Sequence, residues 1–166
     1  VDGDHIMAIC GMHMNKKGIL KNDTVVATVM SNMGLEATFK RAGIKMVRAN
    51  VGDRYVLEEM LKHGHGLGGE QSGHVIFLDH NTTGDGLLTA VNLLKVMAEE
   101  KKPLSELGSV VKVYPQVLMN LHVADKTKYH GNKKIEEVIR NAEAFLGDNG
   151  RILVRPSGTE PIIRVM

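Results

Sequence analysis

Short apolar runs rich in β-branched residues alternate with amphipathic helical patterns along the first hundred residues. Such runs are typical of strands buried on both faces of a sheet, and they lie at Thr24–Met30, Ile44–Ala49 and Val75–Leu78. Between them, apolar side chains recur at helical spacing behind residues that commonly cap helices, namely Asp4, Asn32, Asp53 and Asp85. This alternation predicts an α/β domain with a βαβ-type layer and a mostly parallel sheet.

The longest helix of this first part is expected after Asp85. An apolar stripe follows helical spacing along it, at Leu87, Val91, Leu94 and Ala98. We therefore expect this face of the helix to pack against the sheet.

The pattern changes at residues 102–108, which contain Pro103 and Gly108 and which we interpret as a linker. Beyond it lie a β-rich segment over 110–123, an amphipathic helix that ends at Gly147, and two strands at 152–154 and 162–165. This order predicts a small α+β domain of β-α-β-β type. The predicted domains span residues 1–101 and 109–166.

Composition narrows the classes of function. The chain has 21 Lys and Arg against 19 Asp and Glu and only 4% aromatic residues, so we expect neither nucleic-acid nor membrane partners. The single Cys10 and the lack of a membrane-length apolar run predict a cytoplasmic protein. Because the sequence opens without Met and closes inside a predicted strand, we expect it to be a piece of a longer protein.

The sequence Arg155-Pro156-Ser157-Gly158-Thr159-Glu160-Pro161 between the last two strands carries the strongest chemical signal. An arginine offers a bidentate fork to phosphate, the two hydroxyls donate hydrogen bonds, and Gly158 lets backbone N–H groups approach an anion. Arg164, on the following strand, can add a second charge. An ordinary hairpin turn would also use Pro, Ser and Gly, but it does not explain Arg155 beside two hydroxyls.

Two further loops carry polar groups suited to a sugar. Gly69-Glu70-Gln71-Ser72-Gly73-His74 combines acceptors and donors, and His74 is a candidate for proton transfer or for orientation of the substrate. The alternative is a solvated hairpin. Gly52-Asp53-Arg54 lies where a strand passes into a helix, a common place for ligands in α/β sheets; alone, it is also explained by a helix cap and a surface arginine.

Three other patterns predict no site. Gly64-x-Gly66-x-x-Gly69 matches the dinucleotide fingerprint in letters only, because it follows a helix and leads into a strand. His63-x-His65 is a possible metal pair without an obvious third ligand. Asp2-Gly3-Asp4 resembles a metal loop, but a helix cap explains it better, so we assign no metal ligands in this chain.

Together, the three loops at 50–56, 69–74 and 155–161 and the segment 82–90 resemble the α-D-phosphohexomutase family, in the family's order and over essentially the whole chain. The resemblance implies domains three and four of a four-domain enzyme. It implies that Glu70, Ser72, Gly52, Asp53 and Arg54 bind the sugar, and that the phosphate is held by a second set, Arg155, Ser157, Gly158, Thr159 and Arg164. Gln71, Pro156 and Gly158 are more similar to members that act on glucosamine phosphates than to the others.

The implied activity is an intramolecular phosphotransfer that interconverts glucosamine 6-phosphate and glucosamine 1-phosphate through a bisphosphate. The family's phosphoserine lies in the first domain, and its Mg²⁺ loop, an Asp-x-Asp-x-Asp-Arg run, is expected before Val1. Both lie outside this chain, so the implied partners are the N-terminal domains and a hexosamine phosphate, and we expect the 166 residues alone to be inactive. The alternatives are a family member acting on mannose or glucose phosphates, and a non-catalytic sugar-phosphate binding module.

Overall fold

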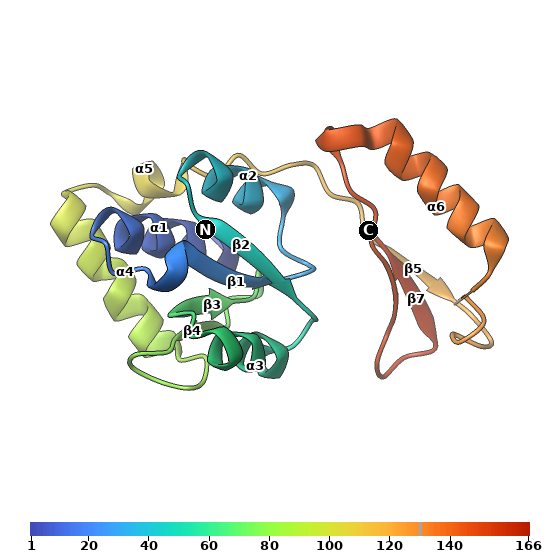
Figure 1. Ribbon diagram of the computed structural model, residues 1–166, viewed down its shortest axis with the longest axis horizontal. Coiled ribbons are helices and arrows are strands. Elements are labelled where there is room, and N and C mark those ends of the chain that lie inside the picture. The colour runs from blue at the N-terminus through green and yellow to red at the C-terminus, as the bar shows by residue number, and fades with distance from the viewer. Residues whose placement is uncertain (130) are drawn as a thin grey trace. The chain divides into compact units, whose positions relative to one another are not determined.

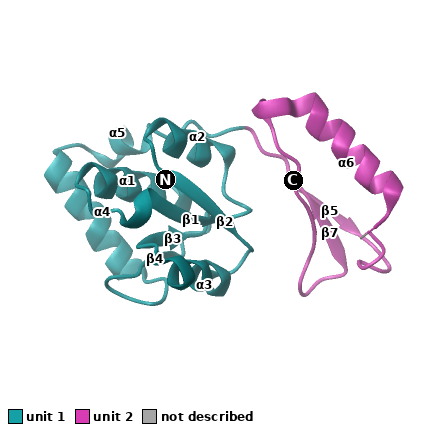
Figure 2. Ribbon diagram, viewed as in Figure 1, with its two compact units in different colours: residues 1–114 teal, residues 115–166 magenta. Residues whose placement is uncertain are grey.

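The computed structural model describes residues 1–129 and 131–166. The chain divides into two compact units, residues 1–114 and 115–166, shown in different colours in Figure 2. Each unit has its own sheet, so each is described by itself.

The sheet of the first unit has the strand order β2-β1-β3-β4. Strand β1 (Thr24–Thr28) pairs in parallel with β2 (Lys45–Ala49) and with β3 (Leu67–Gly69). Only β4 (Val75–Phe77) runs antiparallel, as the second arm of a hairpin with β3. The predicted α/β class with a mostly parallel sheet is confirmed.

Helices cover both faces of this sheet (Figure 1). Because side chains alternate along a strand, Val25 and Ala27 pack with α1 (Gly3–Lys16), α2 (Met33–Arg41) and α4 (Gly86–Glu100) on one face. Val26, between them, packs with α3 (Asp53–His63) on the other. A short 3-10 turn, η1 (Lys21–Asp23), leads into β1.

The second unit has a three-stranded antiparallel sheet in the order β5-β7-β6. Strand β5 (Met119–His122) is followed by α6 (Lys133–Leu146) and a 3-10 turn, η2 (Gly147–Asn149). The hairpin of β6 (Val154–Pro156) and β7 (Ile162–Val165) completes it. The predicted small α+β domain is confirmed.

The predicted buried stripe of α4 is wrong. Leu87, Val91 and Leu94 are 82%, 63% and 60% exposed, whereas Thr89 and Val96 are buried. The buried face tolerates polar residues because they bond to the helix itself: Thr89 Oγ1 donates to the Asp85 carbonyl. Apolar spacing alone therefore selected the wrong side of this helix.

Three details of the helices also differ from expectation. Helix α3 is capped by Gly52, and Asp53, the predicted cap, is its first residue. The cap of α1 is Asp2, whose side chain accepts the backbone N–H of His5, and Asp4 lies buried in the first turn of the helix. The segment read as a linker contains a helix, α5 (Leu104–Gly108), with Leu104 and Leu107 packed on the core of the first unit. Within the β-rich segment 110–123, only β5 is a strand.

Among the described residues, no helix is long and apolar enough to cross a membrane.

Candidate functional site

The loops after β2 and β3 come together at the carboxyl edge of the first sheet. Glu70 follows β3 directly, and its Oε1 accepts the backbone N–H of Gly52, which follows β2, at 3.0 Å. Gly52 has φ 125°, a conformation that favours glycine. One carboxylate thus joins two of the three loops that the sequence singled out.

The loop of residues 70–74 is a tight hairpin connection. The Glu70 N–H donates to the His74 carbonyl at 2.9 Å, and the Gly73 N–H donates to the Glu70 carbonyl at 3.0 Å. Gly73 adopts φ 106°. Ser72 and His74 are exposed, with Ser72 Oγ 3.5 Å from His74 Nδ1. The backbone therefore holds this loop in shape and leaves its hydroxyl and imidazole open to a ligand.

The start of α1 contacts the same loop through a backbone hydrogen bond. The Gly3 N–H donates to the Gln71 carbonyl at 2.9 Å. A Cβ atom at position 3 would lie 2.0 Å from the Glu70 carbonyl oxygen, so only glycine allows this approach. The sequence reading treated Gly3 as part of a helix cap and missed this contact.

The structure does not direct the side chain of Arg54 toward the 70–74 loop. Its guanidinium is 80% exposed and its Nε donates to Glu58 Oε1 at 2.8 Å, one turn along α3. That hydrogen bond raises the pKa of Arg54. Asp53 is exposed and its Oδ1 accepts the Arg54 backbone N–H at 2.8 Å. Of this predicted group, Gly52 alone is bonded to Glu70.

A polar hollow of about 360 Å³ lies against the same turn, lined by residues of β2, of α3 and of the connection between them. Asn50 and Tyr55 belong to its lining, which also contains Arg48, Ala49, Glu58, Glu59 and Lys62.

The predicted phosphate loop lies in the second unit, where two arginines occupy opposite positions on adjacent strands. Arg155 on β6 pairs with Arg164 on β7 in the register of the sheet. Arg164 Nη2 binds Glu160 Oε2 at 2.8 Å. The buried Arg155 Nε has no hydrogen-bond partner among the described residues, and no carboxylate within them forms an ion pair with Arg155. Burial, and then the neighbouring Arg164, lower the pKa of Arg155.

Ser157 and Glu160 close the tip of this loop. Ser157 is buried, its backbone N–H donates to the Ile162 carbonyl at 2.9 Å, and its Oγ accepts the Glu160 N–H at 3.2 Å. Thr159 and Gly158 are exposed. The structure therefore uses Ser157 within the loop and leaves Thr159 and the Gly158 backbone outward.

A lysine that the sequence reading missed holds the loop from the other side. Lys126 Nζ donates to the carbonyls of Ser157, Gly158 and Glu160 at 2.7, 3.2 and 3.4 Å. Because Lys126 engages the carbonyls and the N–H groups of Ser157 and Glu160 are bonded within the hairpin, the exposed Gly158 and Thr159 carry the backbone N–H groups best placed for an anion. Nothing in the local sequence signals this role, because Lys126 lies 31 residues before Ser157.

Asp2 and Asp4 do not fit a Mg²⁺ site. Asp2 Oδ1 is bound to the His5 ring and backbone, and Asp4 Oδ2 accepts the backbone N–H of Asn32 at 2.7 Å inside the core. Mg²⁺ requires open oxygen ligands in octahedral geometry. Both carboxylates serve the fold of the first unit.

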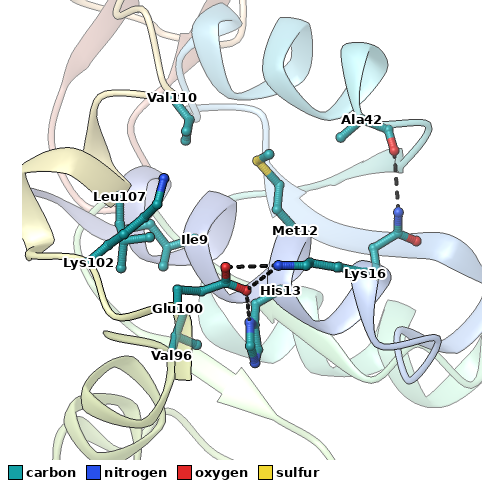
Figure 3. Close-up of a pocket in the computed structure, with 11 residues that line it drawn as sticks. Ile9, Met12, His13, Lys16, Ala42, Val96, Glu100, Lys102, Leu107 and Val110 are labelled. Atoms are coloured by element: carbon teal, nitrogen blue, oxygen red, sulfur yellow. Dashed lines mark hydrogen bonds and ion pairs between the residues drawn. The ribbon is translucent and has the colours of Figure 1, made fainter. Parts of the chain in front are cut away.

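A separate cavity of about 320 Å³ lies between α1, α4 and the segment around α5 (Figure 3). Its lining is mostly apolar, but His13 Nδ1 binds Glu100 Oε1 at 2.9 Å and Lys16 Nζ binds Glu100 Oε2 at 2.9 Å at one edge. None of the residues predicted to bind substrate lines it. These ion pairs connect α1 to the end of α4.

Comparison with known proteins agrees with this arrangement. Residues 2–114 match the family model for phosphoglucomutase/phosphomannomutase, alpha/beta/alpha domain III, and residues 118–166 match the C-terminal domain model of the same family. The chain is 58% identical over 166 residues to a phosphoglucosamine mutase of Limosilactobacillus reuteri and 60% identical to one of Symbiobacterium thermophilum. It spans 37% of the length of each.

The fold is also shared with solved structures of lower identity. An N-acetylglucosamine-phosphate mutase in its product complex matches 99% of this chain, using 40% of its own, with a TM-score of 0.81 at 21% identity. An Aspergillus fumigatus N-acetylphosphoglucosamine mutase, in complex with GlcNAc-6P and magnesium, matches 99% of this chain and 42% of its own, with a TM-score of 0.81 at 18% identity. The chain therefore belongs to the phosphoglucomutase/phosphomannomutase family and carries its third and its C-terminal domains.

Proposed function

We propose that these two domains supply the sugar-recognition and phosphate-binding surfaces of an enzyme that interconverts glucosamine 6-phosphate and glucosamine 1-phosphate through a bisphosphate. Relatives named phosphoglucosamine mutase, 57–60% identical to this chain along its full length, support the choice of sugar. The phosphoryl-carrying serine and the Mg²⁺ loop are assigned to the remaining domains. When bound there, Mg²⁺ would neutralise charge on the transferred phosphoryl group.

The observation that carries the proposal is the pair of arginines on β6 and β7. Like charges directly opposite each other on a sheet are destabilising, and Arg155 has no carboxylate partner among the described residues. A phosphate dianion would satisfy both guanidinium groups through charge-assisted hydrogen bonds. We assign the phosphate that is not being transferred to Arg155, Arg164 and the loop 157–159.

In the sugar-recognition loop, Glu70 and Ser72 are assigned to sugar hydroxyls. Oε1 of Glu70 is already bonded to Gly52, so Oε2 is the oxygen offered to a ligand. The exposed His74 next to Ser72 is assigned to orientation or proton transfer at the reacting hydroxyl. Phosphoryl transfer depends chiefly on positioning and charge neutralisation, and these residues would provide the positioning.

The test is an NMR titration of the 166-residue chain with glucosamine 6-phosphate, mannose 6-phosphate and inorganic phosphate. We expect all three to shift amides of residues 155–161, and glucosamine 6-phosphate alone to shift residues 70–74 strongly. Equal shifts with mannose 6-phosphate would favour a family member with another sugar. Shifts confined to other regions would contradict the assignment of both loops.

A coupled enzyme assay tests whether the reaction centre lies outside these two domains. The 166-residue chain should bind sugar phosphate without converting glucosamine 6-phosphate, since it contains no match to the family's phosphoserine or Asp-x-Asp-x-Asp-Arg sequences. Turnover above a protein-free blank, with host enzyme excluded, would show that the reaction centre lies within these residues.

A further inference from the structure

The turn that ends α3 brings together two imidazoles and a carboxylate, which the proposed function does not use. Glu59 and His63 lie one helical turn apart on α3, and His65 follows two residues later. The sequence reading found no third ligand for the His63-x-His65 pair. The structure supplies it: one ligand atom from each of Glu59, His63 and His65 lies within 4.8 Å of the others.

The backbone fixes this grouping. Gly64 ends α3 with φ 71°, and the N–H groups of Gly64 and His65 both donate to the Met60 carbonyl, folding His65 back against the helix. Asn22 Nδ2 donates to the His63 carbonyl at 3.0 Å and holds the turn from outside. The two imidazole rings consequently stack, with centroids 5.7 Å apart and planes 29° from parallel.

The His65 side chain has an unmet polar group inside the protein. The residue is 7% exposed, and its Nδ1 is buried with no hydrogen-bond partner among the described residues. Buried polar atoms in native proteins nearly always have a partner.

We propose that Glu59, His63 and His65 bind a divalent transition-metal ion of the zinc class, with a fourth position open to solvent. Two imidazoles and one carboxylate form a ligand set that zinc commonly accepts. Imidazole favours Zn²⁺, Co²⁺, Ni²⁺ and Cu²⁺ over Mg²⁺, so this site is distinct in chemistry from the family's Mg²⁺ loop. His63 is 46% exposed and Glu59 28%, which gives an ion direct access.

The ligand atoms, now within 4.8 Å of one another, would have to draw together around the ion. His63 Nδ1 and Glu59 Oε1 now share a hydrogen bond at 2.9 Å. Ligand atoms around a tetrahedral zinc lie about 2.0–2.2 Å from the ion and hence about 3.4 Å from each other. The ion would replace the shared proton and separate these two atoms by roughly half an ångström.

A bound ion would link the end of α3 to the segment that leads into β3 through its shared ligands. His65 is two residues before β3, the strand that leads into the loop containing Glu70. Binding to the folded state alone raises the stability of the fold. We therefore assign the metal a structural role that stiffens the strand leading into the 70–74 loop.

The experiment is a titration of the 166-residue chain with Co²⁺, followed by its visible absorption, and with Zn²⁺, followed by calorimetry. Wild type should bind one ion per chain, give the intense visible bands of tetrahedral Co²⁺, and unfold at a higher temperature with Zn²⁺. His63→Ala, at a half-exposed position that should not disturb folding, and His65→Ala should each lose about tenfold or more in affinity, the range seen when even an outer partner of a metal site is removed. His80→Ala, which removes an exposed histidine outside the cluster, is the matched control.

Three results would overturn the proposal. They are the absence of saturable binding to wild type, unchanged affinity in His63→Ala, and an equal loss of affinity in His80→Ala. Mg²⁺ at the same concentration should neither compete with Co²⁺ nor raise the unfolding temperature. Competition by Mg²⁺ would indicate an oxygen-rich site elsewhere in the chain.

Discussion

Arg155 and Arg164 face each other across β6 and β7, and only Arg164 has a carboxylate partner, Glu160, among the described residues. Two adjacent guanidinium groups repel unless an anion lies between them. The pair is therefore expected to cost stability in the empty protein, and the phosphate that we propose to lie there would relieve the repulsion.

Removing Arg155 should therefore affect phosphate binding and protein stability in different directions. Arg155→Ala should weaken glucosamine 6-phosphate binding by about 2–5 kcal/mol, the usual cost of truncating a desolvated charged contact. Arg155→Lys keeps the charge but loses the fork and should weaken binding less. Without phosphate, Arg155→Ala should be no less stable than wild type. Calorimetric titration and urea unfolding check the two parts, with Lys134→Ala as a control for lost charge. Unchanged affinity in Arg155→Ala would show that residues 155–161 form an ordinary hairpin turn without a role in phosphate binding.

Lys126 should determine the shape of the phosphate loop. Replacing it by Met removes the donor to three carbonyls. Because a hydrogen bond to a charged group contributes about 1.5–3 kcal/mol, the free energy of unfolding should fall by about that amount. Hydrogen exchange of amides 157–160 should accelerate in Lys126→Met. The exposed Lys128→Met is the matched control, and similar exchange in both variants would contradict the role of Lys126.

Two glycines in the same local setting should respond oppositely to alanine. Gly3 and Gly86 each follow a capping aspartate at the first position of a helix. A Cβ at Gly3 meets backbone oxygen at 2.0 Å, whereas one at Gly86 meets nothing within 4 Å. Gly3→Ala should lower the free energy of unfolding by about 1–3 kcal/mol or more. Gly86→Ala should raise it by up to about 1 kcal/mol. Thermal unfolding distinguishes them, and equal effects would refute the close approach.

The buried Asp4 should make stability depend on pH. Burial raises the pKa of its carboxyl, so the folded state holds the proton more tightly than the unfolded state. The stability that this proton provides is complete below the unfolded pKa, about 3.9, and is lost as pH rises through the raised pKa. Relative to wild type, Asp4→Asn should therefore be more favourable at pH 7 than at pH 4. Urea unfolding at both values tests this against the exposed Asp23→Asn; a difference of the opposite sign would contradict it.

Limited trypsin digestion can locate the boundary between the domains. The linker expected at 102–108 contains α5, whereas residues 111–118 have no helix or strand. We expect the first cut after Lys112, giving fragments 1–112 and 113–166 by mass spectrometry. A first cut after Lys101 would favour the boundary predicted from sequence.

The class of each domain was predictable from sequence because it depends on the order of strands and helices, which local patterns carry. The buried face of α4 was not predictable, because it contains Thr89 and Asn92, whose side chains are satisfied by the helix backbone. Which face of α4 is buried is determined by how the helix packs against the rest of the unit, and not by the spacing of its own apolar residues.

The candidate site divides in the same way. The glycines and polar residues of the 69–74 and 155–161 loops stand out locally. The contacts of Glu70 with Gly52 and of Lys126 with the carbonyls of the phosphate loop join residues 18 to 34 positions apart. Such pairings arise only when the strands are assembled, so a single sequence gives no sign of them.

The bond from Glu70 to Gly52 affects how any substitution of Glu70 is to be interpreted. One carboxylate oxygen accepts the Gly52 N–H, and the other is the one that we assign to the ligand. Glu70→Ala would remove both at once, so its loss of affinity would overstate the strength of the sugar contact. Glu70→Gln, whose amide oxygen can still accept the Gly52 N–H, is the variant whose affinity reports on recognition alone.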